Sequence, residues 1–150
     1  QKCFLNAIIL DSLTHFSTII NQKKIVVKTI FESNFEINSD QYLLSIVFNN
    51  LLSNALKYSN DNGEVFIKII QNNKNLLIEI LDNGMGIAQD DLSKIFQPFF
   101  RSNQSLVGSI KGTGLGLSIV KRLCELLEIT IDIQSEISKG TRVSLSFKNK

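Results

Sequence analysis

The fold is decided by residues 41–58, which have the sequence QYLLSIVFNNLLSNALKY. Apolar residues recur here every three or four positions, a spacing that predicts an amphipathic helix. The apolar face consists of Leu44, Val47, Phe48, Leu51 and Ala55. At the helical period of about 3.6 residues, Asn50, Asn54 and Lys57 lie on one stripe beside that face. We therefore expect these polar side chains to edge a cleft rather than to point into bulk water.

The side chains of this stripe suit phosphate and metal chemistry. An amide oxygen is a hard ligand of the kind that Mg²⁺ prefers, and an ammonium group suits phosphate. The alternative is that Asn50 and Asn54 are ordinary helix residues, although asparagine is a poor helix former in mid-helix.

Upstream of this helix, the sequence predicts a second helix and a strand. Apolar spacing predicts the helix at 4–20, and a β-branched run predicts the strand at 24–31. Residues 33–40 are polar and typical of a turn, and either Ser39 or Asp40 can cap the helix that follows.

Downstream, strands and helices are segregated along the chain rather than alternating. The predicted elements are strands at 64–70, 76–81, 129–134 and 142–147 and helices at 89–96 and 115–127. Residues 97–114 contain few apolar side chains and are predicted to form a long loop. The order favours an α+β fold in which helices cover one face of a single sheet.

Composition and charge narrow the class of protein. The length of 150 residues fits one domain, and the net charge of +2 gives no basic footprint for nucleic acid. The adjacent basic pairs Lys23–Lys24 and Lys121–Arg122 are expected to be solvated surface. No apolar run reaches the roughly 18 residues of a membrane span, and the first residues lack the basic start and the small-residue cleavage site typical of a signal peptide. The two cysteines lack metal-ligand spacing, which indicates reduced thiols in a cytoplasmic protein.

A glycine-rich segment, Asp82-Asn83-Gly84-Met85-Gly86, follows the apolar strand at 76–81. Its carboxylate can accept a hydrogen bond from an exocyclic amine, and its glycines let the backbone approach a flat base closely. A simple turn is the alternative interpretation.

Two further segments suit a polyphosphate. Residues 112–117, GTGLGL, lead directly into a predicted helix, so their backbone N–H groups can form an anion site at its N-terminus. The spacing matches neither a P-loop nor a dinucleotide-binding fingerprint. Residues 95–101, IFQPFFR, precede the long loop. These aromatic side chains are either plain core or the anchor of a lid whose Arg101 reaches phosphate.

Together these segments resemble the ATP-binding domain of bacterial sensor histidine kinases, in the superfamily that includes DNA gyrase, heat-shock chaperone and mismatch-repair ATPases. The resemblance extends from about Phe4 to Phe147 and depends on four motifs in order: the asparagine helix, DxGxG, the phenylalanine segment and GTGLGL. It implies the Bergerat fold, a two-layer α/β sandwich in which three helices cover a mixed sheet of about five strands.

The resemblance implies a site for ATP and Mg²⁺. It makes Asn54 the Mg²⁺ ligand and Asp82 the residue that recognises the adenine amino group. Asn50, Lys57 and Arg101 are the implied catalytic residues, and all three contact the nucleotide. The other implied nucleotide-binding residues are Tyr58, Gly84, Gly86, Ile87, Phe99, Gly112, Thr113, Gly114, Leu115, Gly116, Leu117 and Thr141.

The sequence departs from the family in two places. The family often has a His-Gly-Gly-like turn after the last helix, where this chain has Leu127-Glu128-Ile129-Thr130, and the start of the next strand is left open. The single histidine, His15, is not followed by an acidic residue and aligns with the first helix of the ATP-binding domain itself. We therefore expect residues 1–150 to form the ATP-binding domain, without the domain that carries the phosphoacceptor histidine.

Asn50 distinguishes a kinase from an ATPase. ATP-hydrolysing relatives commonly have a glutamate general base at this position, and an amide cannot accept a proton from water. The resemblance implies γ-phosphoryl transfer to a histidine on a separate dimerisation domain, with a response regulator as a further partner. It also implies a monomeric domain in the cytoplasm, within a homodimeric parent that the inner membrane can anchor. An anti-sigma-factor-type serine kinase and a nucleotide-binding module without activity stay open as alternatives.

Overall fold

The computed structural model describes residues 1–98 and 116–148. Its helices are α1 (Leu5–His15), α2 (Ser17–Lys23), α3 (Gln41–Tyr58), α4 (Gln89–Leu92) and α5 (Gly116–Leu126). Its strands are β1 (Lys2–Phe4), β2 (Val26–Phe31), β3 (Glu36–Asn38), β4 (Glu64–Asn72), β5 (Asn75–Asp82), β6 (Ile129–Glu136) and β7 (Gly140–Lys148). In the part of the chain described, no helix has both the length and the apolar composition needed to cross a membrane.

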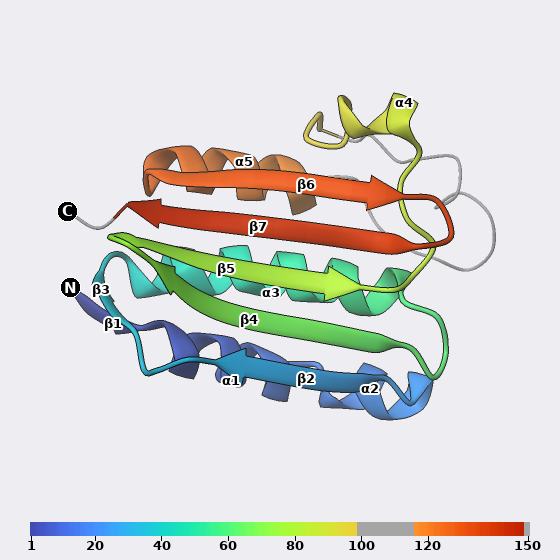
Figure 1. Ribbon diagram of the computed structural model, residues 1–150, viewed down its shortest axis with the longest axis horizontal. Helices are drawn as coiled ribbons and strands as arrows, with labels where there is room; N and C mark the ends of the chain where they lie inside the picture. The colour runs from blue at the N-terminus through green and yellow to red at the C-terminus, as the bar shows by residue number, and fades with distance from the viewer. Residues whose placement is uncertain (99–115, 149–150) are drawn as a thin grey trace.

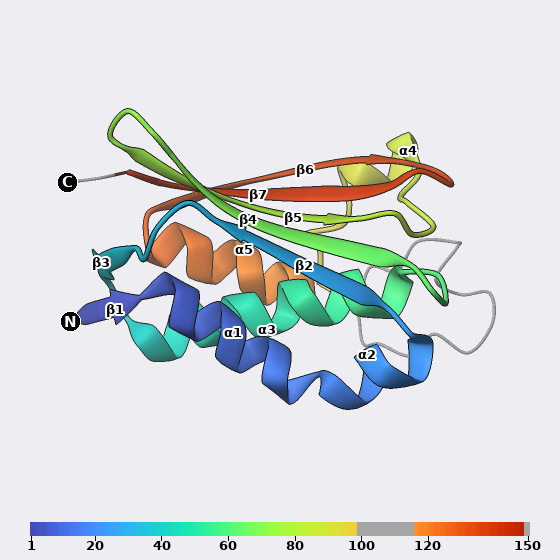
Figure 2. The ribbon, with the colours of Figure 1, turned by 60° about the horizontal axis from the view of Figure 1, so that its bottom comes forward.

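Five strands form one mixed sheet in the order β2-β4-β5-β7-β6 (Figure 1). The β2–β4 pair is parallel and the other pairs are antiparallel. The helices α1, α3 and α5 lie side by side on one face of this sheet, as Figure 2 shows. The predicted two-layer fold, a mixed five-stranded sheet under three helices, is therefore confirmed.

The helix α3 occupies the centre of the helical layer and has the predicted bounds. Asp40 precedes it, and its carboxylate Oδ1 accepts a hydrogen bond from the N–H of Leu43 at 2.9 Å. This bond supplies a partner for one of the N–H groups that the first turn of a helix leaves unpaired. The buried face of α3 packs against alternate side chains of the sheet, such as Ile67 on β4 and Ile78 on β5. Each such fully buried side chain contributes about 1.5–3 kcal/mol.

The N-terminal region differs from the prediction. The single helix expected at 4–20 is two helices, because Phe16 between them leaves the helical backbone region at φ −101° and ψ 15°. The segment 33–40, expected to be a turn, contains β3, which pairs with β1. Each of these strands has only three residues, so neither produces an alternating pattern in the sequence.

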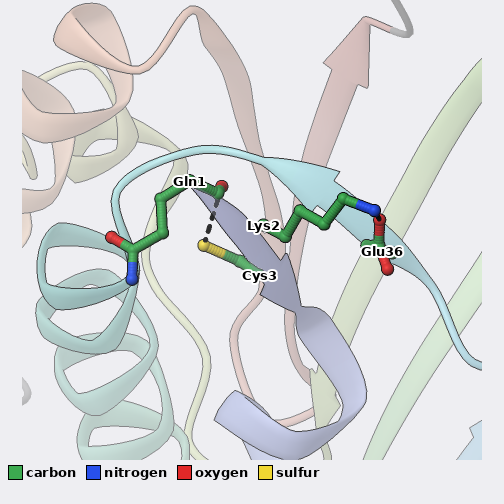
Figure 3. A network of polar contacts seen from close by, with 4 residues as sticks. All are labelled: Gln1, Lys2, Cys3 and Glu36. Carbon is green, nitrogen blue, oxygen red and sulfur yellow. Dashed lines mark hydrogen bonds and ion pairs between the residues drawn. The ribbon is translucent and has the colours of Figure 1, made fainter.

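Side chains support the small β1–β3 sheet on both of its faces (Figure 3). Lys2 and Glu36 form an ion pair across it at 3.1 Å. The thiol of Cys3 is buried beneath the strands, 3.6 Å from the carbonyl of Gln1 and 3.4 Å from that of Ser39. Cys3 and Cys124 on α5 are both free thiols, as the sequence predicts.

Of two later elements, one is shorter than predicted and the other begins where the sequence predicts. The helix expected at 89–96 is the single turn α4, followed by further turns to residue 98. The strand expected at 129–134, whose start the departure from the family pattern left open, begins at Ile129 as predicted and extends to Glu136. Glu128, just before it, has the left-handed φ of 60° that a glycine adopts without strain.

Candidate functional site

Asp82 ends β5 in a half-buried position beside β7. Its Oδ1 accepts a hydrogen bond from the N–H of Gly84 at 2.9 Å, and the backbone N–H of Thr141 donates a second bond to the carboxylate. Burial raises the pKa of Asp82 to about 6, although these two bonds and the charge of Lys23 oppose the rise. At neutral pH the group is mainly a carboxylate, and it can accept a further hydrogen bond from a donor such as an amine.

The glycines after Asp82 let this loop lie directly against the end of α3. A Cβ on Gly84 would stand 2.1 Å from the carbonyl oxygen of Tyr58, a distance that no side chain permits. The next residue, Met85, donates its N–H to that same carbonyl at 3.2 Å. Gly86 has a φ of +73°, and its Cβ would stand 2.1 Å from the carbonyl of Glu136. The loop is thus held between α3 and the β6–β7 hairpin.

Ser135 on β6 attaches the same loop to the sheet. Its Oγ accepts a hydrogen bond from the N–H of Ile87 at 2.8 Å and lies 2.8 Å from both Thr141 Oγ1 and the carbonyl of Gly140. Thr141 pairs with Ser135 on one side and with Asp82 on the other, so the three residues form a row across three strands. Sequence reasoning missed Ser135. The sequence could have indicated it, because Ser135 is a polar residue that continues the alternation of Ile129, Ile131 and Ile133 on the inward face of β6.

Asn50, the first residue of the polar stripe of α3, lies next to the start of α5. Asn50 donates its Nδ2 to the carbonyl of Ile46 at 2.8 Å, which turns its Oδ1 toward Gly116. A Cβ on Gly116 would lie 3.1 Å from that oxygen. Asn54 follows one turn later and is half-buried, and Lys57 is exposed.

The described part of the chain therefore brings two groups of predicted site residues to α3. Asp82, Gly84, Gly86, Ile87 and Thr141 lie at its C-terminal end and on the adjoining strands, whereas Gly116 and Leu117 begin the neighbouring α5. Phe99, Arg101, Gly112, Thr113, Gly114 and Leu115 lie outside the described residues. The roles of all these residues remain predictions.

The prediction that Lys23 is solvated surface is wrong, because its side chain is partly buried against the end of α3. Its ammonium group donates hydrogen bonds to the carbonyl oxygens of Leu56 at 2.8 Å, Lys57 at 3.0 Å and Ser59 at 2.5 Å. Burial lowers its pKa. The neighbouring Lys24 is exposed, as predicted. A pattern of adjacent basic residues cannot distinguish these two lysines, because the partners of Lys23 are more than thirty positions away.

In the second basic pair, too, only one of the two residues is solvated surface. Lys121 on α5 is half-buried, with its ammonium 5.5 Å from the ring centroid of Phe96, a cation–π geometry. Arg122 is exposed, as predicted. His15 at the end of α1 is exposed as well.

Comparison with known proteins gives a consistent assignment. A sequence profile described as "Histidine kinase-, DNA gyrase B-, and HSP90-like ATPase" matches residues 39–150. The heme sensor protein HssS of Staphylococcus saprophyticus is 32% identical over 144 residues, which are 96% of this chain and 30% of HssS. The histidine-protein kinase ArlS of Staphylococcus aureus is 38% identical over 114 residues, 76% of this chain and 25% of ArlS. The chain thus spans less than a third of the length of these curated relatives.

The fold has close counterparts among solved structures. The mycobacterial sensor histidine kinase MprB superposes with a TM-score of 0.84 at 22% identity, covering 100% of this chain and 97% of that one. At this identity the likeness establishes the fold, and it agrees with the family indicated by the sequence.

Proposed function

The chain belongs to the histidine kinase-, DNA gyrase B- and HSP90-like ATPase family, and on that premise we propose that it binds ATP with Mg²⁺ at the site beside α3. The observation that carries the proposal is the carboxylate of Asp82. It accepts hydrogen bonds from two backbone N–H groups, and burial raises its pKa to about 6, so one further donor would stabilise its charged form. The exocyclic amine of adenine supplies such a donor.

The C-terminal half of α3, one to two turns before its contact with the Asp82 loop, provides oxygen ligands of the type that Mg²⁺ accepts. The orientation of Asn50, with Nδ2 bound to Ile46, leaves its Oδ1 facing the first turn of α5. We assign Asn54 as the metal ligand and Lys57 as a phosphate contact, because both follow Asn50 on the same stripe. Bound Mg²⁺ would neutralise charge on the phosphate oxygens. The backbone N–H groups at the start of α5 suit the same phosphates.

The chemistry that fits these residues is phosphoryl transfer rather than hydrolysis. Asn50 carries an amide and cannot take a proton from water, so this position orients groups but provides no general base. We propose that the γ-phosphoryl group passes to a histidine on a separate dimerisation domain of a longer sensor kinase. A response regulator is then the next acceptor. We place the domain in the cytoplasm as a monomer, within a homodimeric parent that the inner membrane can anchor.

Two experiments test these proposals. Calorimetric titration with ATP, with and without Mg²⁺, is expected to show binding that Mg²⁺ strengthens and that Asp82→Asn abolishes. Incubation with radiolabelled ATP and the histidine-bearing segment of the parent protein is expected to give an acid-labile phosphoprotein. An acid-stable product on a partner would instead indicate a serine kinase. Nucleotide binding without any phosphotransfer would reduce the assignment to a binding module.

A further inference from the structure

The C-terminus of α3 is completed by groups that are distant in the sequence. The last four carbonyl groups of a helix lack the partners that continuing the helix would give them. In α3, the carbonyl of Ala55 accepts from the N–H and hydroxyl of Ser59, at 3.2 and 2.6 Å. The carbonyl of Tyr58 accepts from the N–H of Met85 in the Asp82 loop at 3.2 Å. The carbonyls of the two residues between them need donors from elsewhere.

Lys23, the last residue of α2, supplies those donors. Its ammonium group binds the carbonyls of Leu56 and Lys57 and, just beyond the helix, that of Ser59. An ammonium group has three N–H donors, so these bonds use all of them. A positive charge at this place also interacts favourably with the negative end of the helix dipole. Lys23 therefore fixes the last turn of α3 through both hydrogen bonding and charge.

The same turn is the surface on which the Asp82 loop rests. Tyr58 lies between two residues whose carbonyls Lys23 binds, and its own carbonyl contacts Gly84 and Met85 on the other side. A Cβ at Gly84 would overlap Tyr58, so the loop follows any displacement of that carbonyl. We propose that Lys23 is a positioning residue of the nucleotide site, which sets adenine affinity by holding the end of α3 against the Asp82 loop.

This inference rests on the proposed function. The charge of Lys23 also favours nucleotide binding, in addition to its hydrogen bonds to the end of α3. The ammonium of Lys23 faces two carboxylates, Asp61 in the loop after α3 and Asp82 at the end of β5. Its charge lowers the pKa of Asp82 against the larger effect of burial. Removing the charge would therefore both release the turn and leave Asp82 more protonated near neutral pH.

The test compares Lys23→Met with Lys24→Met, a matched loss of one exposed charge at the adjacent position. Calorimetric titration with ATP below the unfolding temperature is expected to give about tenfold weaker binding for Lys23→Met. Lys24→Met is expected to bind within about twofold of wild type. Because burial raises the pKa of Asp82 to about 6, wild-type binding is expected to weaken as pH falls through that value, and the midpoint is expected to rise in Lys23→Met because Asp82 loses a stabilising charge. A protein weakened only in its folding would not show that rise.

Wild-type affinity and an unchanged pH midpoint in Lys23→Met would overturn the inference, provided that Asp82→Asn still abolishes binding. Wild-type binding that does not depend on Asp82 would instead overturn the proposed function, so the two failures are distinguishable. If Lys23→Met does not fold, the test is made on the wild-type protein, by following the ¹⁵Nζ resonance of Lys23 in an NMR titration with ATP. Its position is expected to shift when ATP is added, and an unmoved resonance at saturating ATP would overturn the inference.

Discussion

The two ends of α3 are completed in opposite ways. At the N-terminus, the cap is Asp40, which binds the N–H of a residue three positions later. At the C-terminus, Ser59 binds the carbonyl of Ala55 locally, but the next three carbonyls of the helix are bound by Lys23, more than thirty positions earlier, and by Met85, more than twenty positions later. One end is a local structure that the helix sequence contains. The other end is complete only when α2, α3 and the loop after β5 have come together.

This difference separates stability from function. A local cap can be lost without moving anything outside the first turn of the helix. The long-range end shares its carbonyls with the loop that carries Asp82, so a change there is expected to reach the proposed adenine contact. The predictions below test this distinction, beginning with the largest expected effect.

Gly84→Ala should disrupt the contact between the C-terminus of α3 and the Asp82 loop. The added Cβ would stand 2.1 Å from the carbonyl oxygen of Tyr58 and 2.9 Å from Asp82 Oδ1, so α3 and the loop must separate. We expect unfolding in urea to show a loss of about 3 kcal/mol or more. Gly116→Ala is the control, because among the described residues its Cβ would approach only the side chain of Asn50, with the amide oxygen at 3.1 Å. Equal stabilities of the two variants would contradict the contact between α3 and the loop.

Asp82→Asn is expected to have opposite effects on binding and stability. Loss of the carboxylate should abolish detectable ATP binding, a loss of roughly a hundredfold or more, because the amine of the base loses its charged acceptor. The folded protein, however, no longer has to hold a half-buried charge. We expect the variant to be more stable than the wild type by roughly 1 to 3 kcal/mol at neutral pH, measured by urea unfolding without nucleotide.

The pH dependence of that difference follows from the pKa of Asp82. Folding raises it from 3.8 to about 6, so the folded state binds a proton more tightly than the unfolded state. The wild type should therefore lose stability as pH rises through this range, and the loss is complete above about pH 6. We expect the advantage of Asp82→Asn to disappear near about pH 4. An advantage that did not change with pH would contradict this origin.

Asp40→Ala tests the local end of α3. Removal of the cap should lower the free energy of unfolding by about 1 kcal/mol. ATP affinity, measured by calorimetry on the folded protein, should stay within about twofold of wild type. A loss of affinity like that expected for Lys23→Met would show that the two ends are equivalent.

Asn54→Ala, between the two ends, should have the smallest effect on stability. Alanine is the better helix former, so we expect a gain of about half a kcal/mol. The strengthening of ATP binding by Mg²⁺ should disappear if Asn54 is the metal ligand. Ser53→Ala, one position earlier on the same helix, should retain the full response to Mg²⁺.

The parts of the fold that the sequence predicted are those with local causes. The bounds of α3 follow from its apolar spacing and from Asp40, and the strands of the main sheet follow from their alternation. The missed parts depend on tertiary contact. Neither β1 nor β3 has a pattern of its own, and the break at Phe16 lies within a run of continuous apolar spacing.

The same limit applies to the candidate site. Motifs identified Asp82 and its glycines, and only the family resemblance associated Thr141 with them. Ser135 and Lys23 belong to no motif, because each acts through backbone groups that the fold brings to it. Spacing along one chain cannot predict a partner that lies on another element.

The burial of both cysteines gives the molecule two internal reporters. Alkylating reagents attack the thiolate, and burial raises the pKa of Cys124 to about 11, while Cys3 is fully covered. Each thiol therefore reacts only when its own surroundings open. Cys3 lies in β1 before α1, and Cys124 lies in α5 on the opposite flank of α3 (Figure 2). Their separate alkylation rates would measure local opening at the two flanks of the helical layer without any introduced label.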